Sequence, residues 1–123
     1  FTLGFTPILA PMSRGILATV SARMTDRAKG DEWRSDPRRM GKSYEGQDFM
    51  VLLPEGTLPA TGNIIGSNAA HLQVVTDRKS GRIYAFAAID NLNRGTAGQA
   101  VQSLNIALGL PEDAGLTKIG VAP

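Results

Sequence analysis

The stretch of sequence that decides the fold reads AHLQVVT at 70–76, DRKSG at 77–81 and RIYAFAAI at 82–89. Its two outer segments are rich in β-branched and aromatic residues, and the five residues between them have the length and composition of a hairpin turn. The pattern therefore predicts two antiparallel strands joined by a short connection. This is the strongest hairpin signal in the chain, so the remaining elements are predicted around it.

Two further strands are predicted before this hairpin. Residues 15–23 (GILATVSAR) alternate, and the even-numbered positions from Ile16 to Ala22 form one face, which is typical of a strand with one face more buried. Residues 49–53 (FMVLL) form a short apolar run that is consistent with a buried strand. Between the two strands, residues 24–48 mix acids and bases with few apolar side chains. They predict a solvated excursion with a helical turn or two around 31–40.

After Asn91 the period of the sequence changes from that of a strand to that of a helix. Apolar side chains recur at positions 97, 101, 104 and 108, which form one stripe of a helix. Thr96 is the expected N-cap of this helix. Gly109 and Pro111 supply the expected stop signals.

These periodicities together predict an α+β protein, because several strand-period segments are followed by one helix-period segment. We expect a mixed, largely antiparallel sheet and one long C-terminal helix near 97–109. The tail at 112–123 is expected to dock as an extended segment. The strands of the sheet are predicted at 15–23, 49–53, 70–76 and 82–89.

Composition narrows the class of protein. The chain has 123 residues, of which 42% are hydrophobic and 20% charged, and this favours one folded domain over a disordered chain. The absence of cysteine excludes a disulfide, a cysteine-ligated metal site and a cysteine nucleophile on this chain. There is no run of about 18 apolar residues that would predict a membrane span. The net charge of +2, with acids interleaved among the bases, argues against a nucleic-acid partner.

Two single residues, His71 and Phe1, carry further information. His71 is the only histidine, which leaves no multi-histidine metal site, and its half-polar strand face favours a structural role over a catalytic one. Phe1 is not an initiator methionine, and residues 1–7 resemble a strand in mid-course. We therefore expect a processed, cleaved or truncated chain.

The loop at 90–100 (DNLNRGTAGQA) joins the last predicted strand to the helix. Its glycines let the backbone approach a ligand closely, and the helix start offers free N–H groups and the positive end of the helix dipole. These features allow an anion or a dinucleotide at the loop. An ordinary glycine-bearing loop explains them as well, and the G-x-G-x-x-G fingerprint is absent. Spacing alone therefore favours the plainer interpretation.

Two other loops offer polar groups to a ligand. Gly66, Ser67 and Asn68 lie between two predicted strands, where a hydroxyl and an amide could hold a substrate. The same three residue types are favoured in turns, and turn chemistry is the preferred interpretation. Arg14, within PMSRG at 11–15, places a cation at the mouth of a strand. It is either a ligand for a carboxylate or phosphate or an ordinary surface arginine.

Four stretches of this sequence carry a resemblance to a known family. They are FTPILAPMSRGILAT at 5–19, LPEG at 53–56, GSN at 66–68, and AIDNL with GTAGQAVQ within 88–102, the last being the most specific. In order and approximate spacing they resemble the C-terminal part of the N-acetyl-gamma-glutamyl-phosphate reductases, a semialdehyde dehydrogenase-like family. The resemblance covers nearly the whole chain and is weakest at 24–48, where that family usually has a more regular helix.

The resemblance implies a glyceraldehyde-3-phosphate-dehydrogenase-like C-terminal domain. It would belong to a cytoplasmic, NADP-dependent reductase that converts N-acetyl-glutamyl phosphate to the semialdehyde in arginine biosynthesis. In such a reductase a cysteine thiolate attacks the acyl phosphate, and NADPH reduces the thioester. The cysteine and the family's catalytic histidine lie outside this chain, so no catalytic residue is expected here and His71 does not receive that role. A non-catalytic dimerisation or ligand-binding fragment is the alternative.

The resemblance also implies how the parts are used. Residues 1–89 would belong to the catalytic and dimerisation domain. Residues 90–123 would form a helix and tail that pack on an N-terminal dinucleotide-binding domain, in the same protein or a companion chain. The complete protein would be a homo-oligomer, either a dimer or a tetramer. The candidates for binding substrate are Arg14, Ser67 and Asn68, and those for binding NADP are Asn91, Gly95 and Gly98.

Overall fold

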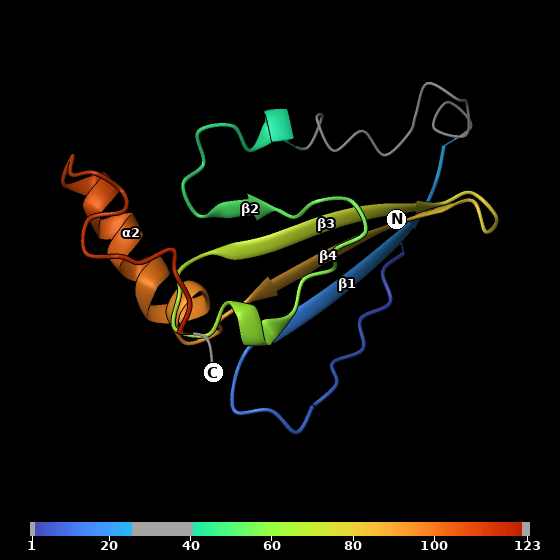
Figure 1. Cartoon of the computed structure of the whole chain (residues 1–123), viewed down its shortest axis with the longest axis horizontal. Coiled ribbons are helices and arrows are strands. Elements are labelled where there is room, and N and C mark those ends of the chain that lie inside the picture. Colours follow the sequence, from blue (N-terminus) through green and yellow to red (C-terminus); the bar gives the residue numbers. More distant parts are fainter. Residues whose placement is uncertain (1, 26–40, 122–123) are drawn as a thin grey trace.

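A four-stranded mixed sheet dominates the structure, a computed structural model that describes residues 2–25 and 41–121 (Figure 1). Its strands are β1 (Ile16–Arg23), β2 (Met50–Leu52), β3 (Ala70–Asp77) and β4 (Arg82–Ile89). The order in the sheet is β1-β4-β3-β2. β4 pairs antiparallel with both β1 and β3, whereas β2 pairs parallel with β3. The prediction of an α+β protein with a largely antiparallel sheet is confirmed.

The predicted hairpin forms in full register, with Asp77 opposite Arg82 at its tip. The Asp77 carboxylate organises the turn, since it accepts hydrogen bonds from the N–H groups of Lys79 (3.0 Å) and Ser80 (3.3 Å) and from the Ser80 hydroxyl (2.6 Å). The bond from the Ser80 hydroxyl is the main cause that lowers the pKa of Asp77. Gly81 follows with a φ of +66°, which side chains other than glycine rarely tolerate.

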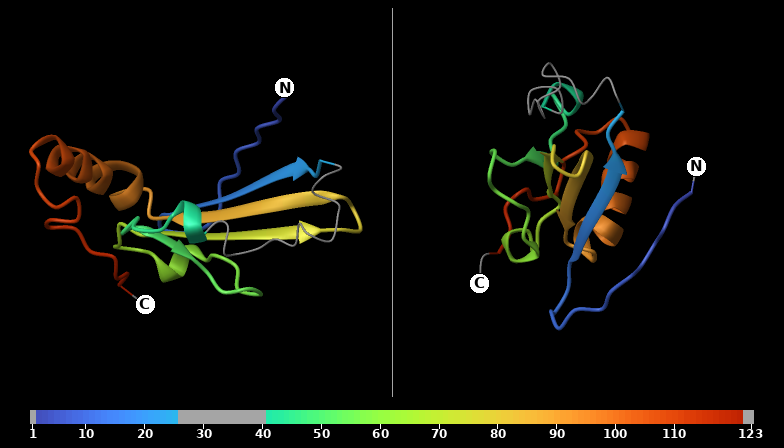
Figure 2. Two further views of the ribbon diagram at one scale, coloured as in Figure 1. Left: turned by 90° about the horizontal axis from the view of Figure 1, so that it is seen from above. Right: turned by 90° about the vertical axis from the view of Figure 1, so that its right-hand side faces the viewer.

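β1 is an edge strand and is exposed along its whole length. The prediction of one more buried face is therefore wrong for this chain. Ile16, Leu17 and Val20 expose 48%, 51% and 60% of their surface, so apolar side chains face solvent on both sides of the strand. Figure 2 shows the described helix α2 (Gly98–Ala107) beyond one end of the sheet rather than over β1. An uncovered apolar edge strand is a surface that pairs readily with another chain.

The C-terminal helix begins earlier than predicted. A π-helical turn, η3 (Asn93–Ala97), runs directly into α2. The prediction that Thr96 caps the helix is wrong, because its hydroxyl lies inside the helical segment and donates to the Asn91 carbonyl over 2.8 Å. The predicted end of the helix is confirmed, since α2 stops before Gly109, which has a φ of +70°.

The apolar stripe of α2 is not covered by any part of the chain that the structure describes. Val101, Leu104 and Leu108 expose 39%, 56% and 64% of their surface, and the buried residues of α2 are Gly98 and Asn105. The helix projects from the end of the sheet (Figures 1 and 2). Helices of this kind bury an apolar stripe against another element, so the stripe marks a contact that the described residues do not supply.

The tail returns to the end of the sheet beside the start of β3. The Asn68 N–H donates to the Thr117 carbonyl and the Val121 N–H to the Ile65 carbonyl, both over 2.8 Å. The Asn105 side chain adds bonds to the tail carbonyls of Glu112 (3.2 Å) and Ala114 (3.0 Å). The predicted docking of the tail is therefore confirmed as far as Val121, but the tail is not extended throughout, since residues 112–115 form a turn. The buried apolar residues are Phe49, Ile64, Ala69, Ala70 and Ala88.

Three predictions need correction or lie outside the described residues. The strand predicted at 49–53 is only three residues long, and Phe49 alone in that run is fully buried. Residues 2–7 form no strand, and their apolar side chains, such as Phe5 at 82% exposure, face solvent. In the excursion at 24–48, residues 41–43 are helical, whereas the turns predicted around 31–40 lie outside the described residues. No described helix is long and apolar enough to cross a membrane.

Candidate functional site

Asp90, at the end of β4, is the centre of the candidate site. Its side chain is completely buried. Oδ2 accepts a hydrogen bond from the Gly66 N–H (2.7 Å) and pairs with Nε of Arg14 (3.1 Å). Oδ1 accepts from the N–H groups of Leu92 (2.8 Å) and Asn93 (3.1 Å). The Asp90 carboxylate therefore contacts three segments of the chain. They are the segment before β1, the loop before β3 and the start of the helical segment.

The charge of Asp90 is compensated in place. Burial alone would raise the pKa of Asp90, but the N–H donors of Gly66, Asn93 and Leu92 and the positive charge of Arg14 together hold it below its usual value. Asp90 is therefore ionised at neutral pH. The first N–H groups of a helical segment are the donors that attract an anion. Here the chain fills that position with its own carboxylate.

Arg14 lies directly before Gly15 and β1. The contact to Asp90 uses Nε, which is one of the five N–H donors of a guanidinium group. The Arg14 side chain stays 30% exposed, and among the described residues Asp90 is its only ionic partner. The structure therefore leaves the terminal nitrogens of Arg14 for a further acceptor.

The side chain of Asn91 also contacts the segment before β1, at Gly15. Its Oδ1 accepts a hydrogen bond from the Gly15 N–H over 2.6 Å. Gly15 has a φ of +114°, and a Cβ there would stand 3.0 Å from the side chain of Thr61. The Nδ2 group of Asn91 has no partner among the described residues. Asn91 thus uses its oxygen within the chain and keeps its amide donors for a ligand.

Ser67 and Asn68 are turned into the protein. Ser67 is fully buried, and its hydroxyl donates to the Ile64 carbonyl (3.0 Å) and accepts from the Ala69 N–H (3.2 Å). These are the turn contacts that the plainer interpretation predicts. Asn68 is 5% exposed and donates through Nδ2 to the Thr117 carbonyl over 3.4 Å. Its buried Oδ1 has no hydrogen-bond partner within residues 2–25 and 41–121.

The two glycines predicted for the cofactor differ in their surroundings. Gly95 is exposed, and a Cβ there would meet the side chains of Ile89 and Asn91 at the ordinary distances of 3.5 and 3.7 Å. Gly98 is buried, and its Cβ would stand 1.6 Å from Oδ1 of Asn68 and 3.0 Å from the Asn93 carbonyl oxygen. Of this pair, only Gly95 leaves room for a ligand beside the backbone.

Sequence reasoning missed Gln73, which holds the LPEG loop against the sheet. Gln73 is 3% exposed, and its Nε2 donates to the carbonyls of Leu53 (2.9 Å) and Pro54 (2.7 Å). Its Oε1 accepts from the Val74 N–H over 2.8 Å. A lone amide among the apolar residues of a predicted strand is the signal that would have identified it.

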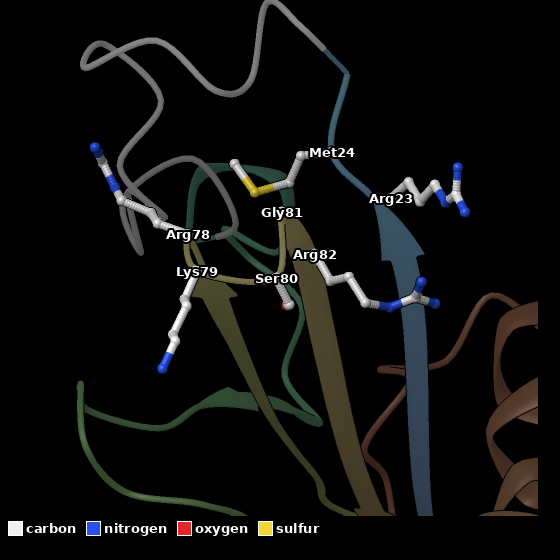
Figure 3. A pocket seen from close by; sticks show the side chains of 7 residues that line it. All are labelled: Arg23, Met24, Arg78, Lys79, Ser80, Gly81 and Arg82. Atoms are coloured by element: carbon white, nitrogen blue, oxygen red, sulfur yellow. The ribbon is translucent and has the colours of Figure 1, made fainter.

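A basic hollow of about 630 Å³ lies at the hairpin end of the sheet, far along β4 from Asp90. Figure 3 shows Arg23 and Arg82 extending to one side of the hairpin and Arg78 and Lys79 to the other. Arg82 also donates to the Ser21 hydroxyl over 2.9 Å. The charged groups do not converge on one point, and none of the predicted site residues lines this hollow. Within the described residues no three His, Asp or Glu side chains are placed to hold a metal ion.

Comparison with known families decides the affiliation. Residues 1–91 match the family described as "Semialdehyde dehydrogenase, dimerisation domain". The chain belongs to this dimerisation-domain family. Within the dimerisation-domain match lie Arg14, Asp90 and Asn91, whereas Gly95 and Gly98 follow it.

Curated relatives of this dimerisation domain extend the match over the whole chain. It is 88% identical over 123 residues to a protein named N-acetyl-gamma-glutamyl-phosphate reductase from Bifidobacterium longum (strain DJO10A). Proteins of the same name from Bifidobacterium animalis subsp. lactis (strain AD011) and Mycobacterium avium (strain 104) are 62% identical over 125 residues and 55% identical over 122. The alignments cover 99–100% of this chain but 34% of each relative. The chain thus spans about one third of the length of these relatives.

Proposed function

We propose that the chain forms the C-terminal third of an N-acetyl-gamma-glutamyl-phosphate reductase, a cytoplasmic enzyme of arginine biosynthesis that uses NADP. The observation that carries this proposal is the identity of 55–88% over nearly all of the chain to proteins of that name. The chain has no cysteine to form a thioester, so its part in the reaction is to bind and to position. The nucleophile belongs to the remainder of the protein.

Arg14 is the proposed contact for an anionic group of N-acetyl-glutamyl phosphate. Its terminal nitrogens form a planar fork that matches a phosphate or a carboxylate. The partial exposure of Arg14 supports this role. Ser67 and Asn68 are proposed to shape the substrate side through the loop that they stabilise, since their own polar groups point inward.

The residues proposed for the cofactor fit one end of NADP better than the other. The open backbone at Gly95 and the amide donors of Asn91 suit an uncharged group such as the nicotinamide carboxamide or a ribose. They do not suit the pyrophosphate, because Asp90 already accepts from the N–H groups of Leu92 and Asn93. When bound, the cofactor supplies the hydride. Asn91 and Gly95 would orient its nicotinamide end. Gly98 would support the loop by packing closely against Asn68.

The uncovered surfaces support the proposed assembly. Residues 1–89 would belong to the catalytic and dimerisation domain, and 90–123 would pack on an N-terminal dinucleotide-binding domain, in the same protein or a companion chain. The exposed stripe of α2, which includes Leu104 and Leu108, is the proposed contact to that domain. The exposed β1 is the proposed contact to a second subunit in a dimer or tetramer. A dimerisation fragment without any catalytic partner is the alternative function.

The site assignment is tested in the complete reductase with Arg14→Gln. Loss of one charged hydrogen bond should raise the KM for N-acetyl-glutamyl phosphate about tenfold or more. The KM for NADPH should stay the same. Lys42→Gln is the matched control, because Lys42 is exposed and also carries a single positive charge. An unchanged substrate KM in Arg14→Gln would remove Arg14 from the substrate site.

A further inference from the structure

We infer that Asp90 is a positioning residue that aims the Arg14 guanidinium at the anionic substrate and couples the substrate side of the site to the cofactor side. The inference rests on the proposed function, because it takes the substrate to be an acyl phosphate that Arg14 binds. It goes further in giving a task to a residue that touches neither ligand.

Capping alone does not explain a charged residue at this position. The N–H groups of Leu92 and Asn93 need an acceptor, and a neutral Asn or Ser side chain serves that purpose in other proteins. The N–H of Gly66 occupies the second oxygen of Asp90, which an Asn side chain would replace with a donor. A fully buried carboxylate also carries a large desolvation cost, and a buried ion pair often adds no net stability. The pair between Asp90 and Arg14 therefore points to a role in orientation rather than in stability.

The contact geometry suits that role. The Asp90 carboxylate lies 3.1 Å from Nε of Arg14, so its charge attracts the inner edge of the guanidinium. The four N–H donors on the terminal nitrogens can then bind two oxygens of one anion together. A side chain that is already fixed loses less conformational entropy when its ligand binds.

Two parallel links join the substrate side to the cofactor side. Arg14 contacts Asp90 through its side chain, and the next residue, Gly15, donates its N–H to the side chain of Asn91. β1 follows Arg14 and Gly15, and β4 precedes Asp90 and Asn91. The two strands pair with each other, and Ile16 lies opposite Ile89. The same carboxylate of Asp90 also binds Gly66 on the substrate side. Asp90 thus contacts Arg14 and Gly66 on the substrate side and Leu92 and Asn93 on the cofactor side. These contacts fix the two sides relative to each other.

The test uses the complete reductase with Asp90→Asn, Arg14→Lys and the double variant. Asparagine keeps an acceptor oxygen for Leu92 and Asn93. It loses the charge that attracts Arg14 and the oxygen that accepts from the Gly66 N–H. Both single variants should raise the KM for N-acetyl-glutamyl phosphate about tenfold, with a smaller change in kcat. The double variant should be no worse than either single one, because the two residues act as a unit. Asp77→Asn is the matched control, since Asp77 also accepts backbone N–H groups but lies at the hairpin tip.

The outcomes separate this inference from the proposed function. If Arg14→Lys and Arg14→Gln both leave the KM unchanged, the proposed substrate site is wrong. If the Arg14 variants raise the KM but Asp90→Asn folds and does not, the positioning role alone is overturned. If Asp90→Asn does not fold, the positioning role is tested by comparing the substrate KM of Arg14→Lys with that of Arg14→Gln. Positioning predicts that lysine is nearly as poor as glutamine, whereas a lysine that keeps most of the affinity contradicts it.

Discussion

Asn68 and Gly98 share one space: Oδ1 of Asn68 lies 1.6 Å from the point where a Cβ of residue 98 would stand. Gly98 has an ordinary helical backbone, with a φ of −66° and a ψ of −36°. The position therefore requires glycine for room and not for conformation. This contact joins the loop before β3 to the first turn of α2. It makes Gly98 part of the packing between them, with no open surface for a ligand.

Gly98→Ala should destabilise the protein, whereas Gly95→Ala should not. The new Cβ at position 98 forces Asn68 out of its buried place, and overpacking of this kind costs about 1–3 kcal/mol. At position 95 the Cβ meets only ordinary contacts, and alanine favours the helix over glycine by about 1 kcal/mol. Chemical denaturation of the two variants measures the difference in the free energy of unfolding.

A rescue variant checks the cause. Asn68→Ala removes the atom that the new Cβ would overlap, so Asn68→Ala with Gly98→Ala should be less unstable than the sum of the single variants. A coupling of about 0.5–3 kcal/mol is expected for residues in contact. Strict additivity in this cycle would show that the two residues do not compete for space.

Gly95 is the position at which close approach of the cofactor can be tested. From sequence, a β-branched residue at Gly98 is expected to weaken NADP binding in a protein that stays folded, but the contact with Asn68 makes that variant unsuitable. Gly95→Val should instead lower the affinity of the complete reductase for NADP about tenfold with little change in melting temperature. Unchanged affinity with normal stability would place the cofactor elsewhere.

Gln73 should protect the LPEG loop from proteolysis. Gln73→Ala removes the donor to the Leu53 carbonyl, whereas the Pro54 carbonyl keeps the N–H of Thr57 over 3.1 Å. A buried group that loses its hydrogen bond costs about 1–3 kcal/mol. Limited proteolysis should then cut the loop near Glu55 faster than in the parent protein. Gln99→Ala, an exposed change in α2, serves as the control. Equal cutting rates in both variants would contradict this role of Gln73.

His71 should make stability depend on pH. Burial lowers the pKa of His71, and its Nδ1 has no hydrogen-bond partner in the described part of the chain. The unfolded chain therefore binds a proton more readily than the folded one. Stability should be full above the ordinary pKa of about 6.5 and should fall as the pH drops through it toward the lower folded value. Denaturation midpoints between about pH 5 and 8 should show this slope, and His71→Asn should flatten it.

Local elements could be predicted from the sequence, and long-range contacts could not. The hairpin at 70–89 depends on strand alternation and on a turn that Asp77 closes within three residues. The start of the helix was misplaced because its first N–H groups are satisfied by Asp90, and Asp90 is fixed in turn by the distant Arg14 and Gly66. The bonds from Leu92 and Asn93 to Asp90 follow a local capping pattern that the prediction missed. No local pattern encodes the contacts of Asp90 with Arg14 and Gly66.

The candidate site divides in the same way. Of the residues that the motifs predicted for the site, Arg14 and Asn91 lie together around Asp90 in the fold. The contact between Asn68 and Gly98 and the hold of Gln73 on the LPEG loop each join segments far apart in sequence. The exposure of β1 was predicted wrongly for a further reason. Alternation predicts which side chains share a face, but none of the described segments covers either face of β1.

We propose that residues 1–123 bind and position the ligands of a reductase whose nucleophile lies outside them. The sharpest test is to measure the oxidation of NADPH that depends on N-acetyl-glutamyl phosphate, by the complete reductase and by the isolated chain at equal concentration. We expect turnover by the complete protein and none by the isolated chain, which has no cysteine to form the thioester. Turnover by the isolated chain, or no turnover by the complete protein, would show that this division of roles is wrong.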